Sequence, residues 1–210
     1  MQREIIDLWA DIGSEGYWSD LLAKNPGIFV PFSERWPQPG FIGSHYFDSD
    51  SRVVVLGQNP RASNTVTTAE ADMEMFRLIR NHSQERSAES IVELFSMIRS
   101  FMLGIDYGRA WIPITTVRRH LSLALDSVAY LNLIPLATSE DRIVPAFEYA
   151  YENSTMLQLQ SLNPDKIVVF GKGTYDRFKY LGGTDQYEAR YVGQRSYSRD
   201  APPVRRWLNR

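Results

Sequence analysis

The sequence contains no cysteine among its 210 residues. This absence excludes disulfide bonds, Cys-ligated zinc, iron–sulfur clusters and a cysteine nucleophile, and it favours a cytoplasmic protein. Histidine is scarce as well, and His45, His82 and His120 lack the spacing of metal ligands. We therefore expect no metal and no other cofactor.

Long apolar runs are also missing. No uncharged stretch is long enough to span a bilayer, and the first ten residues include Arg3, Glu4 and Asp7. We expect a protein that is neither exported nor inserted in a membrane. The 24.2 kDa chain is 43% hydrophobic and 23% charged, which is typical of a globular protein, so residues 1–210 are predicted to form a single domain. The composition leaves the oligomeric state open.

The chain has little net charge, formally −2, but its charge is unevenly distributed. Residues 1–165 hold 13 basic and 21 acidic side chains, whereas residues 166–210 hold 10 basic and 4 acidic ones. From residue 190 onward Asp200 is the single acid beside six arginines, which are Arg190, Arg195, Arg199, Arg205, Arg206 and Arg210. Because a guanidinium group donates bidentately to phosphate, this end of the chain is a candidate phosphate-binding region. The alternative is a charged end that is simply solvated.

Hydrophobic patterning predicts strands that alternate with helices. Short runs rich in β-branched residues predict strands at 52–57, 128–133 and 166–171. Apolar residues at helical spacing predict helices at 1–12, 69–81, 87–102, 144–162 and 174–181, with a break at 13–16 and an irregular region at 25–50. This order indicates an α/β fold with a mostly parallel central sheet and helices on both faces. Ligands in such folds bind at the carboxyl ends of the strands.

Polar segments occur where the predicted strands end. They are Gly57-Gln58-Asn59-Pro60, Asn132 within residues 131–136, and Gly171-Lys172-Gly173. The last of them closes a Leu-x-Pro, strand, Gly-Lys pattern over residues 162–172, and residues 194–199 read Gln-Arg-Ser-Tyr-Ser-Arg. In this order, the segments resemble the motifs of the uracil-DNA glycosylase superfamily over about residues 52–199.

The resemblance implies a three-layer α/β/α sandwich and a DNA glycosylase active in DNA repair. Such an enzyme flips a nucleotide out of DNA and excises uracil, a mispaired base or a modified base. The family has a water-positioning Asp or Asn where this chain has Asn59. With an Asn at this position, the motif most resembles that of the mismatch-specific uracil/thymine-DNA glycosylase branch. Gln58 is implied to line the base pocket, and Asn132 to read the base edge with its donor and acceptor. These three residues are the candidate catalytic residues.

Further residues are implied to contact the substrate or the DNA. The candidate substrate-binding residues are Gly57, Pro60, Arg61, Ser63, Phe76 and Tyr46. Phe76 and Tyr46 are candidates for stacking on the base, with packing in the core as the alternative for both. The candidate DNA-binding residues are Lys172, Arg195, Ser196, Tyr197 and Arg199. Tyr197 occupies the place of the family segment that wedges into the duplex, where a tyrosine can fill the vacated stack.

The chain departs from the family pattern at two positions. Arg61 follows Pro60 where the family often has glycine, and Gln194 stands where the uracil enzymes have a histidine that stabilises the base anion. Two other functions therefore stay open. One is a catalytically inactive member that binds DNA or nucleotides. The other is a hydrolase of small-molecule N-glycosides or a nucleotide-binding α/β enzyme.

Overall fold

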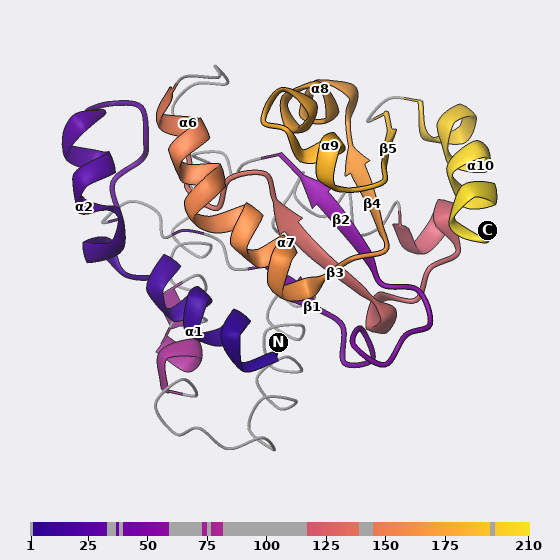
Figure 1. Ribbon diagram of the computed structural model, residues 1–210, viewed down its shortest axis with the longest axis horizontal. Coiled ribbons are helices and arrows are strands. Elements are labelled where there is room, and N and C mark those ends of the chain that lie inside the picture. Colours follow the sequence, from indigo (N-terminus) through magenta and orange to yellow (C-terminus); the bar gives the residue numbers. More distant parts are fainter. Residues whose placement is uncertain are drawn as a thin grey trace.

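The computed structural model describes residues 2–32, 37, 40–58, 73–74, 77–81, 117–138, 145–193 and 196–210. These residues form an α/β fold around a mixed, mostly parallel sheet of five strands in the order β1-β3-β2-β4-β5 (Figure 1). The short strand β1 (Phe41–Ile42) pairs antiparallel with β3, and all other neighbouring strands are parallel. The expected α/β class with a mostly parallel sheet is therefore confirmed.

The three predicted strands form the centre of the sheet. They are β2 (Val53–Gly57), β3 (Val128–Asn132) and β4 (Lys166–Phe170), each within one residue of its expected bounds. Every residue of β2 and β3 is buried, because helices cover both faces. Strands of this kind read as continuous apolar runs rather than as alternating patterns, which is why the sequence identifies them.

One face of the sheet packs against helices from both halves of the chain. They are α1 (Gln2–Ile12), α2 (Glu15–Lys24), α6 (Pro145–Ala150), α7 (Met156–Leu162) and α8 (Lys172–Tyr180), followed by the short α9 (Gly183–Gln186). Residues 145–162 run as one helix, because a π-helical turn, η4 (Tyr151–Thr155), joins α6 to α7. In the core of this face, Val54, Leu56 and Ile167 of the sheet pack with Trp9 of α1 and Leu159 of α7.

The other face packs against α10 (Tyr197–Leu208) and a helical turn, η2 (Val117–Leu121). A single turn, η3 (Leu125–Ser127), then leads into β3. The second core contains Val55 and Val168 of the sheet, Leu121 of η2, and Val204 and Trp207 of α10. Figure 1 shows α10 on the opposite side of the molecule from α2.

Several elements differ from the sequence-based expectation. The helices expected at 1–12, 144–162 and 174–181 are present, and residues 73–74 and 77–81 of the expected helix at 69–81 are helical. The expected break at 13–16 is too long, because α2 begins at Glu15. The irregular region at 25–50 contains β1, and the edge strand β5 (Ala189–Val192) and α10 were not predicted. The helix predicted at 87–102 lies outside the described residues.

Two buried contacts explain why α2 forms where glycines predicted a break. Trp18 and Leu21 of α2 are buried in the core, and the Trp18 indole Nε1 donates a hydrogen bond of 2.8 Å to the carbonyl of Ile12. This contact ties the start of α2 to the end of α1, so burial outweighs the low helix propensity of Gly16. Within the described part of the chain, no helix is both long and apolar enough to cross a membrane.

Candidate functional site at the carboxyl edge of the sheet

Gly57 and Asn132 lie side by side at the carboxyl ends of two neighbouring parallel strands. They are opposite each other in the register of β2 and β3, and the amide of Leu133 donates to the Gly57 carbonyl at 2.9 Å. The chain enters β3 from η2 on the α10 face, and leaves it toward α6 on the opposite face (Figure 1). Ligands in open α/β sheets bind outside the carboxyl ends of the strands, which is where Gly57 and Asn132 lie.

Asn132 is buried and held at two atoms. Its side-chain Oδ1 accepts a hydrogen bond of 3.0 Å from the Tyr130 hydroxyl, and its backbone carbonyl accepts one of 3.0 Å from Thr155 Oγ1. Thr155 belongs to the π-helical turn η4, and such turns are frequent at functional sites. The motifs contain Asn132 but neither Tyr130 nor Thr155.

Gly57 provides room for the Tyr130 ring. A Cβ atom at this position would overlap the Tyr130 hydroxyl and would lie 2.9 Å from Cζ of the ring. Tyr130 and Asn132 are two residues apart on β3 and so project on the same face of the sheet. The absence of a side chain at residue 57 therefore lets Tyr130 reach Asn132 across the end of β2.

Of the candidate residues that directly follow Gly57, at positions 58–63, the structure describes only Gln58. Gln58 follows Gly57 directly and is half-buried. The candidates outside the described residues are Asn59, Pro60, Arg61, Ser63, Phe76 and Arg195. Their roles stay predictions from the sequence.

Lys172 lies at the same edge, where β4 ends and α8 begins. Gly171 makes the turn with a φ of 95°, a left-handed conformation that favours glycine. The exposed Lys172 Nζ donates to Asp176 Oδ2 at 2.7 Å, and this hydrogen bond raises the pKa of Lys172. Lys172 thus places an exposed cationic group, paired with Asp176, at the edge next to β2.

Asp200 anchors the segment that follows β5. Its Oδ2 accepts hydrogen bonds from Ser196 Oγ at 2.5 Å and from the Gly193 amide at 3.1 Å, and Oδ1 accepts one from Arg199 Nε at 3.1 Å. These donors, with the Ser196 hydroxyl first, lower the pKa of Asp200 below its usual value. One carboxylate thus fixes both Gly193 and Ser196, which flank the predicted DNA-binding residue Arg195.

Replacing Asp200 by Asn is expected to lower the free energy of unfolding by about 1–3 kcal/mol, because charge-assisted hydrogen bonds at the start of α10 are weakened. A carboxyl group whose pKa is lowered by folding stabilises the protein above its usual pKa, and this stabilisation is lost as the pH falls through the lowered value. Urea unfolding at pH 7 and at pH 3 should therefore show a smaller difference between wild type and Asp200→Asn at pH 3. An equal difference at the two pH values would contradict this role.

Tyr197 is the first residue of α10, and its ring lies in a stack. The ring centroid is 6.0 Å from that of Phe170, with an interplanar angle of 18°, and 5.9 Å from that of His120, with an angle of 23°. Phe170 is the last residue of β4 and His120 belongs to η2. To fill a gap in a DNA stack, Tyr197 would have to leave both of these partners.

Tyr46 is not brought to this edge. It is fully buried, its ring packs edge-on against Phe47, and its hydroxyl donates to the carbonyl of Leu162 at 3.3 Å. Leu162 precedes β4, so Tyr46 lies at the amino end of the sheet, away from Gly57 and Asn132. Of the two alternatives for Tyr46, the structure supports packing in the core.

The outer face of α10 carries arginines. Arg199, Arg205 and Arg206 are exposed, and Arg199 and Arg206 are seven residues apart, which places them on one side of the helix about 10 Å apart along its axis. The inner face holds Ala201, Val204 and Trp207 against the sheet. We name Arg199, Arg205 and Arg206 the α10 arginine face; it begins at the carboxyl edge of the sheet and runs away from it.

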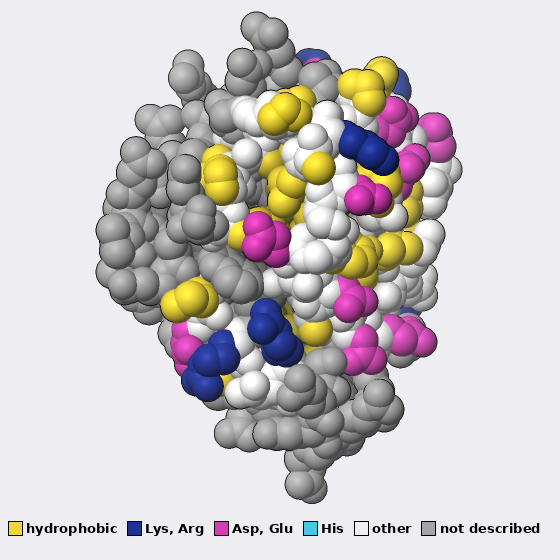
Figure 2. Space-filling view, turned by 90° about the vertical axis from the view of Figure 1, so that its left-hand side faces the viewer, with side chains coloured by type: hydrophobic (Ala, Val, Ile, Leu, Met, Phe, Trp, Pro, Cys, Tyr) yellow, Lys and Arg dark blue, Asp and Glu magenta, His cyan; other side chains and the backbone are white. Residues whose placement is uncertain are grey.

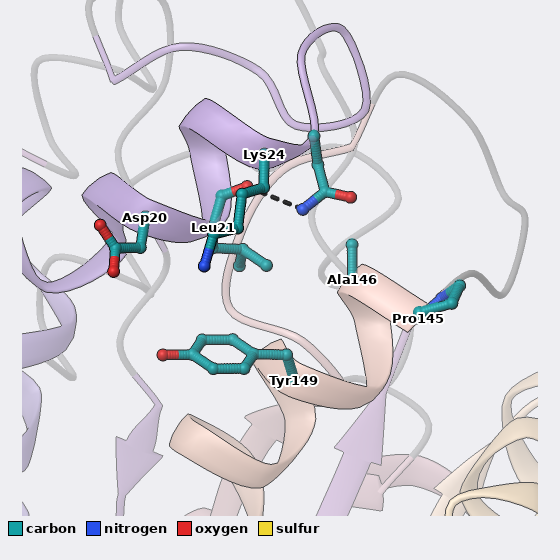
Figure 3. Close-up of a pocket in the computed structure, with 7 residues that line it drawn as sticks. Asp20, Leu21, Lys24, Pro145, Ala146 and Tyr149 are labelled. Atoms are coloured by element: carbon teal, nitrogen blue, oxygen red, sulfur yellow. Dashed lines mark hydrogen bonds between the residues drawn. The ribbon is translucent and has the colours of Figure 1, made fainter.

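The opposite side of the molecule differs in character. Figure 2 shows acidic side chains scattered among apolar and basic ones on that side. It contains a shallow pocket between α2 and α6, lined by Asp20, Leu21, Lys24, Asn25, Pro145, Ala146 and Tyr149 (Figure 3). None of the candidate residues lines this pocket, so it is separate from the candidate site.

The comparisons with known proteins add no identification. No protein-family model and no curated protein matches the chain. Among the described residues, no group of three or more His, Asp or Glu side chains is placed to hold a metal ion. The function is therefore inferred from the motifs and from the geometry of the carboxyl edge.

Proposed function

We propose that this protein is a DNA N-glycosylase with the three-layer α/β/α architecture of the uracil-DNA glycosylase superfamily. The observation that carries the proposal is the register of β2 and β3, in which Gly57 and Asn132 end adjacent strands side by side. Gln58 and Asn59 follow Gly57 directly in the sequence. The segments that resemble two separate motifs of the superfamily thus converge at the edge where α/β folds bind ligands.

The reaction is the hydrolysis of the bond between C1′ of deoxyribose and a ring nitrogen of the base. The C–N bond breaks with its electron pair passing to the base, the oxygen of water bonds to C1′, and a proton from that water ends on the base. The transition state has a sugar with oxocarbenium character and a base with developing negative charge. The protein must therefore hold the flipped nucleotide, stabilise the charge of the leaving base and orient the water.

Each of these tasks has a proposed residue. Asn59 orients the water through its side-chain amide, Gln58 lines the base pocket, and Asn132 donates to an acceptor on the base. An amide cannot take a proton as a carboxylate can, so the proposed mechanism suits a base that leaves easily, such as an activated or modified one. Lys172 and the α10 arginine face bind phosphates on either side of the flipped nucleotide.

The affinity for DNA is expected to fall with salt, and replacing Arg206 by Gln should reduce the slope of log K against log[salt] by about 1. The physical reason is that each phosphate contact releases condensed counterions from the DNA. Fluorescence anisotropy at several salt concentrations measures the slope. Lys24→Gln, which removes a positive charge on the opposite side of the molecule, should leave it unchanged.

A panel of labelled oligonucleotides tests the proposed activity. Single- and double-stranded DNA carrying uracil, mispaired thymine or a modified base is incubated with the protein and then treated with alkali, which cleaves abasic sites. Strand scission at one position, lost in Asn59→Ala, is the expected result and names the base.

The second candidate function is a protein of this fold that binds DNA without cleaving it. It is favoured by the amide at residue 59 and by Gln194 in place of a histidine, because both weaken the catalysis of base release. This candidate predicts salt-dependent binding of DNA with no scission of any substrate. A third outcome, turnover of free nucleosides without retention on DNA, would indicate a small-molecule N-glycoside hydrolase.

A further inference from the structure

Tyr130 occupies an unusual place in the candidate site. It lies two residues before Asn132 on β3, its ring crosses the end of β2 over Gly57, and its hydroxyl donates to Asn132 Oδ1 at 3.0 Å. The residue is 5% exposed. Burial also raises the pKa of its phenol, so the hydroxyl keeps its proton and stays a donor at neutral pH.

We propose that Tyr130 is a positioning residue that sets the orientation of the Asn132 side-chain amide and thereby selects bases that present a carbonyl group to it. This inference rests on the proposed glycosylase function. It adds a specificity-determining residue that the motifs do not contain.

The side-chain amide of Asn132 has two chemically different ends. Rotating the Asn132 side-chain amide by half a turn exchanges Oδ1, an acceptor, with Nδ2, a donor, at almost no cost in shape. One orientation directs the donor to a base and the other directs the acceptor to it. An unconstrained Asn can therefore read a carbonyl group or an amino group on a base edge.

Tyr130 removes this freedom. Within the described part of the chain, the Tyr130 hydroxyl donates its proton to Asn132 Oδ1. Turning the amide over would place Nδ2 against the hydroxyl, so the buried O–H would lose the acceptor that it has among the described residues, which is costly. The oxygen is therefore kept toward Tyr130, and Nδ2 is the end that can donate to a base.

The consequence is a preference among bases. Uracil, thymine and hypoxanthine present a carbonyl oxygen at the position where cytosine and adenine present an amino group. A fixed Nδ2 donor matches the carbonyl group and opposes the N–H of the amino group. A site built on a hydrogen bond rejects a base that leaves the buried donor unpaired.

Tyr130→Phe tests the proposal, because it removes one hydroxyl and keeps the ring over Gly57. We expect kcat/KM for the carbonyl-bearing base that the wild type excises to fall about tenfold. The ratio of excision between that base and its amino-bearing counterpart at the same position should fall as well. Thermal melting is the control for folding.

A double-mutant cycle separates positioning from packing. If Tyr130 acts through Asn132, Tyr130→Phe should have no further effect on kcat/KM in an Asn132→Ala background. If it only packs, the two effects should multiply, and this result, or an unchanged base preference in Tyr130→Phe, would overturn the inference.

A readout that does not require catalysis distinguishes failure of this inference from failure of the proposed function. In NMR spectra of the free protein, Tyr130→Phe should shift the two Nδ2 proton signals of Asn132, and unchanged signals would overturn the positioning role. Titration with free uracil and free cytosine should show preferential binding of uracil by the wild type and a smaller preference in the variant. If the signals shift and this preference is seen but no DNA substrate is cleaved, the proposed function fails while the positioning role stands.

Discussion

Asn132→Ala is expected to lower kcat/KM for base excision by about a hundredfold or more, since it removes the proposed donor to the base. The variant should also lose about 1–3 kcal/mol in the free energy of unfolding, because the buried Tyr130 hydroxyl loses its acceptor. Single-turnover excision assays measure the first effect and denaturant unfolding the second.

The matched control is Asn25→Ala. Asn25 lies at the end of α2, and its Nδ2 donates to the carbonyl of Leu21 at 2.8 Å. This variant should excise the base at the wild-type rate. Excision by Asn132→Ala at the wild-type rate would show that the edge between β2 and β3 does not bind the reacting base.

The second large effect is expected for Gly57→Ala. The added methyl group would overlap the Tyr130 hydroxyl and lie 2.9 Å from Cζ, so the ring must move and Asn132 with it. Overpacking of this kind costs about 1–3 kcal/mol, and the displaced amide should reduce excision by more than tenfold. The melting temperature and the rate of excision should therefore fall together.

Gly173→Ala provides the matched control for this change. Gly173 lies in the first turn of α8, and a Cβ atom there would meet nothing within 4 Å. Because alanine is the better helix former, Gly173→Ala should leave stability unchanged or raise it slightly. A Gly57→Ala variant as stable and as active as Gly173→Ala would contradict the packing described for Tyr130.

The central strands were predictable because a strand that is buried on both faces has a continuous run of apolar residues. Residues 53–56 and 167–170 are apolar without interruption. The edge strand β5 has no such apolar run, because its central residues, Arg190 and Tyr191, are exposed. The helix α10 was missed because Pro202 and Pro203 lie inside it, and proline removes hydrogen bonds from a helix interior.

The candidate site was predictable only in part. The parallel register explains why Gly57 and Asn132, 75 positions apart in the sequence, can be assigned to one edge from strand ends alone. Tyr46 lies in a region with no predicted element, so its position at the amino end could not be inferred. Tyr130 has the pattern of a core residue in a buried strand. Its contact with Asn132 becomes visible only in the structure, because the ring occupies the space left by the missing side chain of Gly57 on the neighbouring strand β2.

Asp200 illustrates a further kind of information that the sequence does not carry. In the sequence it is one acid among arginines, which indicates a solvated charge. In the structure it accepts from Gly193 and Ser196 and organises the segment between β5 and α10. Its partners include a backbone amide, and backbone partners leave no residue pattern to find.

The most direct test of the central claim is isotope analysis of the products. DNA that carries each base of the panel in turn is incubated with the protein in water enriched in ¹⁸O, and the products are analysed by mass spectrometry. Hydrolysis at C1′ predicts a free, unlabelled base and an abasic sugar, and immediate trapping of that sugar should find ¹⁸O at C1′. Intact DNA recovered from a stable complex with the protein would contradict the glycosylase and leave a DNA-binding protein of the same fold.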